Sequence, residues 1–218
     1  MASRHTHPRP SPEAMRFPRL AYSGGGGPPG LQRATPERSN AVLGMLVFLG
    51  SEVMLFAALI SAYLVLRAGA ESWPPPGQPR LPIALTGVNT AVLLLSGVTM
   101  WWARGAARLA DMATSVRWLV VTLVLGVTFL SIQGGEWAQL VRFGLRLSSG
   151  VYGGIFYALI GMHAAHVLVA VLVLVAVLWR ARGAMCSVAR QTDVEVGHLY
   201  WLFVVSVWPL LYLLVYLL

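Results

Sequence analysis

The sequence contains very little charge for its length. Only 11% of its 218 residues are charged, whereas 57% are hydrophobic, and the mean hydropathy is +0.68. A soluble domain carries about 25% charged residues. Because so few charges cannot give a folded chain of this size a water-facing surface, the composition excludes a soluble enzyme and places the chain in a lipid bilayer.

Lysine is absent, and cysteine occurs once. All sixteen basic residues are Arg, against eight acidic residues, so the formal net charge is +8. The arginines are scattered between apolar runs rather than clustered on a motif, which indicates membrane topology and argues against a nucleic-acid partner. The single Cys186 excludes an intramolecular disulfide and a cysteine-based metal site.

Residues 1–40 differ in composition from the rest of the chain. They contain seven of the thirteen prolines, six arginines and the glycine run 24–27, and they lack the apolar core of a secretion signal. Such a segment buries too little apolar surface to offset the entropy of ordering. We expect an N-terminal tail that is either solvated or held by a partner or the membrane, with the basic, aromatic stretch 15–22 resting on lipid headgroups.

Residues 41–218 are expected to form the membrane domain. Five apolar segments follow the tail, each near the roughly 20 residues that a helix needs to cross the hydrocarbon. They cover about 41–66, 81–103, 117–135, 150–179 and 198–218. Helices are the only option, because a lipid-exposed strand would leave its backbone groups unpaired. The predicted fold is an all-α membrane protein, a bundle of five transmembrane helices.

The arginines favour one orientation of this bundle. If the N-terminus is cytoplasmic, twelve arginines lie inside and only Arg67, Arg80, Arg142 and Arg146 lie outside. Cytoplasmic loops of membrane proteins carry an excess of basic residues. The pattern therefore predicts a cytoplasmic N-terminus and a C-terminus outside.

Small residues recur at helical spacing in two of the segments. Such stripes let helix backbones approach closely in lipid, so we expect them to pack against neighbouring helices. The first stripe consists of Gly44, Ser51, Ala58 and Ala62, and the second of Gly154, Ala158, Gly161 and Ala165. The polar residues of interest lie off these stripes.

Glu52 is the one charge inside the first apolar segment. A carboxyl at this depth costs a few kcal/mol to insert, so intramembrane acids point first to a function. Handling of protons or of lipid headgroups is one interpretation. The other is a protonated side chain that only joins two helices through a hydrogen bond.

His163 and His166 lie three residues apart in the fourth segment. Neutral imidazoles are good ligands for zinc, copper or haem iron. Two histidines fill only half of a tetrahedral site, however, and Glu52 is the only candidate third ligand. The more economical expectation is that both histidines are hydrogen-bonded within the bundle and that the chain binds no metal.

Depth predicts a partner for Glu52. In antiparallel first and fourth helices, Glu52 lies roughly 16 Å and His166 roughly 19 Å above the inner helix ends. His163 is one turn further out and stays possible if the helices tilt differently. Since an unpaired polar group in hydrocarbon is costly, we expect Glu52 to contact His166, directly or through one water.

Several ordered blocks of the sequence resemble the cytochrome c oxidase subunit III family, in its short five-helix form. The match covers about residues 40–218. The blocks are GMLVF (44–48) with SEVMLF (51–56), WPP (73–75), VNTAVLLLSG (88–97), Gln133 with Glu136-Trp137, GVYG (150–153), GMHAAHV (161–167) and EVGHLYW (195–201).

This resemblance implies an accessory subunit of a haem–copper terminal oxidase. Such a subunit carries no redox centre and binds phospholipid. It packs against catalytic subunit I and subunit II, where haem and copper reside, in a bacterial cytoplasmic membrane. The complex can also join a larger respiratory supercomplex. It implies candidate residues for lipid or proton handling, which are Glu52, Glu136, His163, His166, Glu195 and His198. No residue of this chain is expected to be catalytic.

One block departs from the family pattern. The last helix of the family carries a Trp-His-Phe-Val-Asp-type run, but here Leu202 and Val205 stand in the places of its His and Asp. Two relatives stay open as alternatives for this reason, namely the similar proteins of nitric oxide reductases and of quinol oxidases. A small membrane transporter and a two-histidine haem protein are further alternatives, although the sequence offers few ionisable groups at depth for either.

Overall fold

The computed structural model of the chain describes residues 36–75, 83–144, 150–182 and 187–217. The expected tail up to residue 35, with its stretch 15–22, and Cys186 lie outside these residues. The secondary-structure elements of the described part are all helices, without a strand, and five of these helices are long and apolar enough to cross a membrane. The predicted fold class, an all-α bundle of five membrane-spanning helices, is therefore confirmed.

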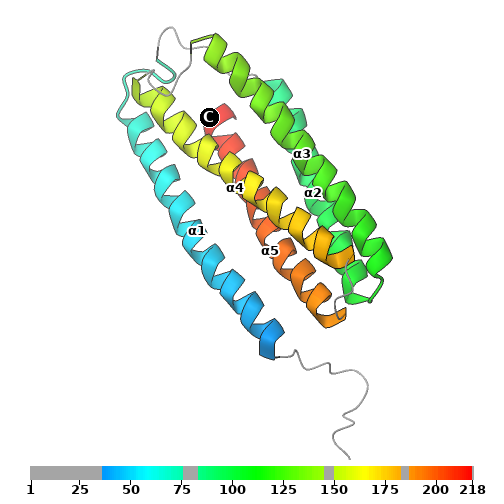
Figure 1. The fold of residues 1–218 in the computed structure, drawn as a ribbon. Helices are drawn as coiled ribbons and strands as arrows, with labels where there is room; N and C mark the ends of the chain where they lie inside the picture. Colours follow the sequence, from blue (N-terminus) through cyan, green and yellow to red (C-terminus); the bar gives the residue numbers. More distant parts are fainter. Residues whose placement is uncertain (1–35, 76–82, 145–149, 183–186, 218) are drawn as a thin grey trace, which may run out of the picture. The chain divides into compact units, whose positions relative to one another are not determined.

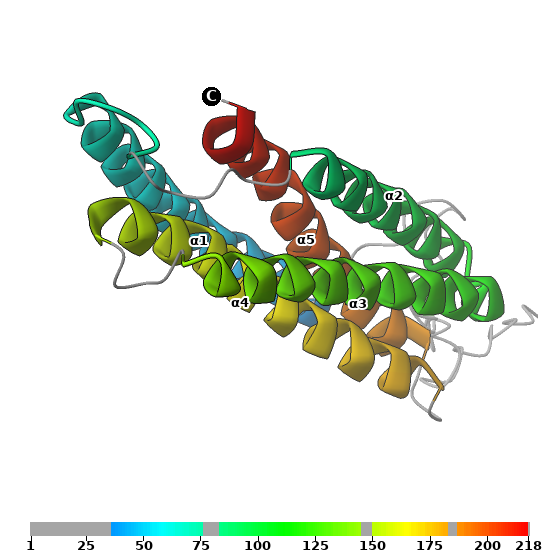
Figure 2. The same cartoon turned by 90° about the horizontal axis from the view of Figure 1, so that it is seen from above.

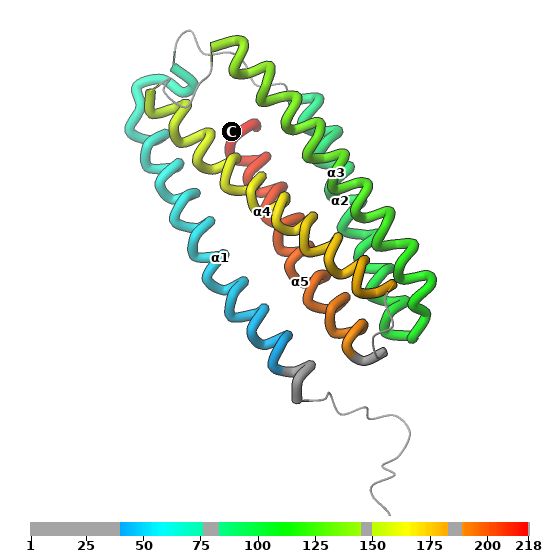
Figure 3. The backbone as a smooth tube through the Cα atoms, viewed as in Figure 1, coloured from blue at the N-terminus to red at the C-terminus, as the bar shows by residue number. Residues whose placement is uncertain are grey.

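The helices follow one another in alternating directions, as Figure 3 shows. The chain is a multi-pass membrane protein with short connections between its spans. The helices are α1 (Pro36–Ala68), α2 (Ile83–Arg108), α3 (Met112–Arg142), α4 (Gly150–Arg182) and α5 (Ser187–Tyr212), and a π-helical turn, η2 (Leu213–Leu217), continues α5.

Helix α5 is the central element of the bundle. It contacts α1, α2 and α4, while α3 packs on α2 and α4 (Figures 1 and 2). Helix α1 touches only α4 and α5 closely, and most of its residues are exposed. The exposed large apolar side chains belong to lipid-facing or partner-facing surfaces, as expected for membrane helices.

The helices extend past the ranges that hydropathy alone indicates. The third runs over Met112–Arg142 rather than 117–135, and the fifth begins at Ser187 rather than 198. Hydropathy marks only the apolar middle of a span, whereas backbone hydrogen bonding continues through polar residues at its ends. As a result Glu136 lies inside α3, and Glu195 and His198 lie inside α5.

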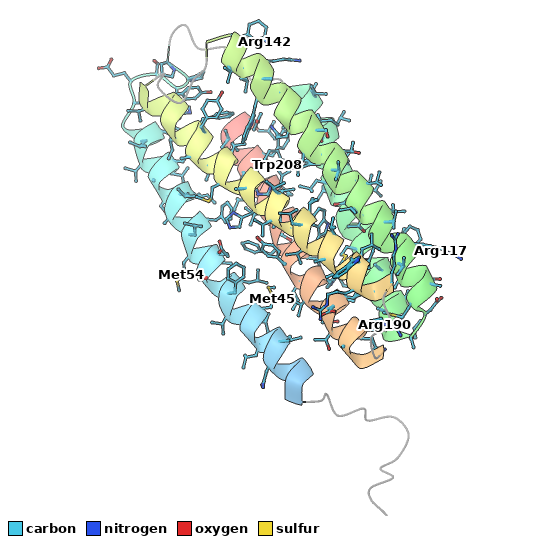
Figure 4. The ribbon with its side chains drawn as sticks, in the orientation of Figure 1. Met45, Met54, Arg117, Arg142, Arg190 and Trp208 are labelled. Atoms are coloured by element: carbon cyan, nitrogen blue, oxygen red, sulfur yellow. The ribbon has the colours of Figure 1, made fainter. Side chains whose placement is uncertain are left out.

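The small-residue stripe of α1 does not pack within the described part of the chain, and that of α4 packs only in part, since Gly154 and Gly161 are half-buried. All four stripe residues of α1 are exposed, and on α4 Ala158 and Ala165 are exposed as well. The contact face of α1 carries large side chains instead, among them buried Phe56 and Tyr63. Figure 4 shows the two faces: Met54 points away from the bundle, and Met45 lies on the side facing the other helices.

Asp111 is the N-cap residue of α3 and lies outside the membrane-spanning segments. Its carboxylate accepts a hydrogen bond from the backbone N–H of Thr114 at 3.0 Å. This hydrogen bond, together with the positive charge of Arg117, lowers the pKa of Asp111 below its ordinary value of 3.8. A lowered pKa means that Asp111 stabilises the fold fully above the unfolded-state pKa and loses this contribution as the pH falls through the folded-state pKa.

Asp111→Ala is therefore expected to lower the thermal midpoint of the protein at neutral pH by a small amount. The difference from wild type should vanish at a pH below the folded-state pKa of Asp111, where the carboxyl is protonated. Asp111→Asn is the matched control, because an Asn side chain also caps a helix N-terminus. An Ala effect that stayed constant over the acidic range would contradict the assigned role.

Candidate functional site

Glu52 of α1 and His166 of α4 form a direct pair in the membrane interior. His166 Nε2 lies 2.7 Å from Glu52 Oε2, and both side chains are largely buried, with 11% and 14% exposed. His166 Nδ1 lies 2.7 Å from the Met162 carbonyl oxygen, one turn earlier in α4. The predicted pairing of Glu52 with His166 is confirmed.

The hydrogen bonds of His166 define how many protons the pair holds. A carbonyl oxygen can only accept, so His166 Nδ1 must carry a proton and donate it to Met162. One further proton lies between Nε2 and Glu52, either on the carboxyl or on the imidazole. In both cases the pair is electrically neutral as a whole, which suits its low-dielectric surroundings.

His163 occupies a different environment from His166. Its ring is 1% exposed and stacks on Trp208 of α5 with ring centroids 4.9 Å apart. Neither ring nitrogen has a hydrogen-bond partner among the described residues. The expectation that both histidines are hydrogen-bonded is therefore wrong for His163. Three residues along a helix turn its ring away from Glu52 and into an aromatic environment that includes Trp208, labelled in Figure 4.

The three candidate ligands do not form a metal site. Among the residues that the structure describes, no three His, Cys, Asp or Glu side chains converge as a metal would require. Phe56 lies against both imidazoles, with ring centroids 6.3 Å from His163 and 5.1 Å from His166. Glu52 contacts only His166 of the two histidines, and the Phe56 ring packs beside both imidazoles.

Glu195 and His198 belong to a second cluster, which joins α2 to α5. Arg104 donates from Nε to Glu195 Oε2 at 2.9 Å and from Nη2 to Oε1, and Arg108 Nη2 lies 3.4 Å from Oε1. Arg104 Nη1 also contacts His198 Nε2 at 3.3 Å. Because a guanidinium only donates, His198 accepts through Nε2 and carries its proton on Nδ1.

The sequence pattern indicated only a role in membrane topology for Arg104, not this ion pair. The available signal was its place in helical register with Arg108 at the end of α2, which puts both guanidinium groups on one face. Its carboxylate partner comes from a helix nearly a hundred residues later. That pairing is decided by how α2 and α5 pack.

Glu136 lies in a third polar cluster, between α2 and α3. Its carboxylate accepts hydrogen bonds from Thr86 Oγ1, 3.1 Å from each carboxylate oxygen, and from Gln133 Nε2 at 3.0 Å. Asn89 Nδ2 lies 3.5 Å from Gln133 Oε1 and donates to the Phe129 carbonyl at 3.2 Å. Glu136 is 2% exposed. Thr86 and Asn89 were not among the predicted site residues.

A groove of about 460 Å³ opens between α1, α4 and α5, on the side of the Glu52–His166 pair nearer the N-terminal end of α1. Most of its wall is apolar, with Phe48, one helical turn before Glu52, among its lining residues. An ion pair of Arg180 Nε with Asp193 Oδ2, at 2.8 Å, lies among the lining residues. The groove is therefore apolar along most of its wall and carries the Arg180–Asp193 ion pair among its lining residues.

Leu202 and Val205, the two departures from the family pattern, pack against Gly97 of α2. A Cβ atom at Gly97 would lie 3.2 Å from Val205 Cγ1 and 3.7 Å from Leu202 Cδ2. The contact of Leu202 and Val205 with Gly97 is therefore apolar, beside the hydrogen bond from Trp201 Nε1 to Ser96 Oγ at 3.2 Å.

The chain is similar in sequence to one known protein family and to several of its members. The family described as Cytochrome c oxidase subunit III matches residues 33–218. The chain is 35% identical over 178 residues to cytochrome c oxidase subunit 3 of Synechocystis sp., covering 81% of this chain and 75% of the relative. It is 37% identical over 187 residues to the Corynebacterium diphtheriae protein, covering 84% and 91%. It is 35% identical over 179 residues to the Lumbricus terrestris protein, an alignment that covers 79% of this chain and 68% of the relative.

The family match over residues 33–218 spans all of the described helices. The match and these relatives confirm the resemblance of the sequence blocks. The chain therefore belongs to the cytochrome c oxidase subunit III family, as a multi-pass membrane subunit of a haem–copper oxidase complex.

Proposed function

We propose that this chain is a non-catalytic accessory subunit of a haem–copper terminal oxidase, which reduces oxygen in aerobic respiration. It supports the catalytic subunit through packing, bound lipid and proton handling, and it carries no redox centre of its own. The match of the family over residues 33–218 carries this proposal. Haem and copper would then belong to the partner subunits I and II.

Proton handling is assigned to the Glu52–His166 pair. The pair shares one mobile proton across a 2.7 Å contact inside the membrane. Both side chains keep a small exposed fraction, so the pair is not sealed off within the bundle. His163, one turn away, adds a buried imidazole without a hydrogen bond to described residues. Glu136, Glu195 and His198 are the other candidates, of which Glu195 is tied into an ion pair with Arg104 that favours a structural contribution.

Lipid binding is assigned to the groove between α1, α4 and α5. Its apolar wall suits an acyl chain, because burial of an acyl chain against apolar side chains is favourable. Arg180, at the charged end of the groove, suits a phosphate headgroup. A lipid in this position would cover the approach to Glu52 along α1.

The orientation and location of the subunit complete the proposal. The arginine distribution favours a cytoplasmic N-terminus in a bacterial inner membrane. Figure 4 shows Arg117 and Arg190 toward one end of the bundle and Arg142 at the other. Residues 1–40 would form a tail apart from the membrane domain 41–218 and available to partner subunits, and the complex would be able to join a larger respiratory assembly.

Deletion of this chain from the complex is expected to leave the haem absorbance spectrum unchanged while activity decays faster during turnover. The reason is that the deletion removes contacts, lipid and proton supply but no haem or copper ligand. The measurement compares haem spectra and oxygen consumption over many turnovers in complexes with and without the chain. Immediate loss of haem would contradict the proposed non-redox role.

Purification through a tag on this chain tests its assembly. A haem-containing polytopic subunit should co-purify in gentle detergent. A pure homo-oligomer of this chain, or a Soret band in the isolated subunit, would contradict the proposal and favour a transporter or a haem-binding protein.

A further inference from the structure

The end of the bundle where α2 ends and α5 begins carries more positive than negative charge. The described acidic residues at this end are Asp111, Asp193 and Glu195, whereas the described arginines are Arg104, Arg108, Arg117, Arg180, Arg182 and Arg190. Arg180 pairs with Asp193 at 2.8 Å, and the charge of Arg117 acts on Asp111. Six positive charges against three negative ones attract anions from outside the described residues.

Arg104 is fully engaged inside the chain. Its Nε and Nη2 atoms donate to the two carboxylate oxygens of Glu195, and its Nη1 atom contacts His198 Nε2 at 3.3 Å. The side chains of Arg104 and Glu195 are mostly buried, with 21% and 10% exposed. The negative charge of Glu195 is therefore matched by Arg104 alone.

Arg108, one turn further along α2, has no such match. Its side chain is 54% exposed, and its Nη2 atom lies 3.4 Å from Glu195 Oε1, the same oxygen that accepts from Arg104. No other described acidic residue lies within ion-pair distance of Arg108. Two guanidinium groups beside one carboxylate oxygen repel each other, so a second anion next to Arg108 would be stabilising. A guanidinium has several N–H donors, which leaves Arg108 donors for such an anion.

The exposed face of α2 leads from lipid to this arginine. Leu94, Val98 and Trp101 follow one another on this face at helical spacing, each with a largely exposed side chain, and Arg108 continues the same stripe. Gly105 stands between Trp101 and Arg108, and a Cβ atom there would meet no other atom within 4 Å. The stripe is therefore apolar along most of its length, open at Gly105 and positively charged at its end.

Two tryptophans indicate where the membrane surface lies. Trp101 is 61% exposed, with its ring centroid 6.0 Å from that of His198, and the neighbouring Trp102 ring lies 4.7 Å from that of Trp118 on α3. Tryptophan is enriched at the boundary between hydrocarbon and headgroups. Arg108 lies seven residues, or roughly 10 Å, beyond Trp101 toward the end of α2, which is the level of the lipid phosphates.

We propose that Arg108 binds the phosphate of an anionic phospholipid whose acyl chain lies along Leu94, Val98 and Trp101. Arginine pairs with phosphate through two parallel hydrogen bonds, and basic pockets between transmembrane helices bind anionic headgroups. Arg104 and Glu195 are positioning residues, because Arg104 fixes the carboxylate that holds Arg108 Nη2. In the orientation proposed above, the lipid belongs to the inner leaflet.

This lipid site is separate from the groove between α1, α4 and α5. None of the residues that line the groove belongs to α2, and its headgroup ligand is Arg180. Arg180→Gln is therefore expected to weaken lipid binding in the groove and to leave the lipid at Arg108 in place. A groove without lipid would refute the groove assignment and leave the site at Arg108 to its own test.

The test is native mass spectrometry of the purified oxidase complex, stripped of lipid in detergent and titrated with dioleoyl phosphatidylglycerol. Arg108→Gln should raise the dissociation constant of one bound lipid by about tenfold or more, as expected for loss of a hydrogen bond between charged groups. Arg182→Gln is the matched control, since it removes the same charge from an exposed position at the same end of the bundle, on α4. It should leave this lipid bound as in wild type.

Three results would overturn the inference. Equal losses in Arg108→Gln and Arg182→Gln would show diffuse attraction to a basic surface. Equal binding of dioleoyl phosphatidylcholine would remove the preference for an anionic lipid, and displacement of the lipid by inorganic phosphate at equal concentration would indicate a site for free anions. If Arg108→Gln does not assemble, Arg108→Lys decides, because lysine keeps the charge but lacks the planar fork, and an unchanged dissociation constant would refute the phosphate contact.

Discussion

His166→Leu is expected to destabilise the protein by about 3 kcal/mol or more, the cost of removing one partner from a buried, hydrogen-bonded pair. The substitution leaves the Glu52 carboxyl in the membrane interior without its acceptor or counter-charge at 2.7 Å. Glu52→Leu should produce a loss of similar size by exposing His166 Nε2. The measurement is the free energy of unfolding of the detergent-solubilised subunit by chemical denaturation.

The double substitution Glu52→Leu/His166→Leu provides the sharper test. Exchange of a buried polar pair for apolar residues of similar volume is often close to neutral. The double variant should therefore be much more stable than the sum of the single variants implies, with a coupling free energy of at least about 1 kcal/mol. Ser51→Ala, at an exposed neighbouring position whose hydroxyl bonds only within α1, is the control. Additive effects of the two single substitutions would show that the pair does not interact.

Gly126→Ala is expected to destabilise the α3–α5 contact by about 1–3 kcal/mol, which is typical for overpacking a filled core. A Cβ atom at Gly126 would overlap Cη2 of Trp201 and lie 3.0 Å from its Cζ2. Trp201 is 1% exposed and donates from Nε1 to Ser96 Oγ of α2 at 3.2 Å, so its ring cannot withdraw without losing that hydrogen bond. The thermal midpoint of the purified complex is the readout.

Gly134→Ala in the same helix is the matched control. A Cβ atom at Gly134 meets no other atom within 4 Å, so the substitution should be neutral or slightly stabilising, because Ala favours helix over Gly by up to about 1 kcal/mol. Combining Gly126→Ala with Trp201→Phe should restore part of the loss by removing the clashing ring. Equal effects at Gly126 and Gly134 would rule out the steric explanation.

The Glu52–His166 pair was predictable because it depends on quantities that a sequence contains. The rise per residue and the alternating direction of successive spans give the depth of each polar residue. The cost of an unpaired group in hydrocarbon then requires a partner at similar depth. The same reasoning failed for His163, which has the right depth to remain a candidate but faces Trp208 and Phe129 in the aromatic core.

The small-residue stripe of α1 illustrates the same limit. Its spacing is that of a helix-packing motif, yet in this chain the large residues of the opposite face make the contacts and the stripe is exposed. The Arg104–Glu195 pair was missed for a related reason, since its two members come from helices α2 and α5 that are distant in sequence.

By itself, the sequence determined the membrane setting, the number of spans, the family and the depth of each polar residue, because these follow from hydropathy, helix length and ordered motifs. Only the tertiary structure decided which side of each helix faces its neighbours, and with it the convergence of Thr86 and Gln133 on Glu136. The physical reason is that lipid tails are as apolar as a leucine side chain. In water, hydrophobicity distinguishes the inner face of a helix from the outer one, but in a bilayer both faces are apolar, and side-chain packing and a few buried hydrogen bonds select the rotation of each helix.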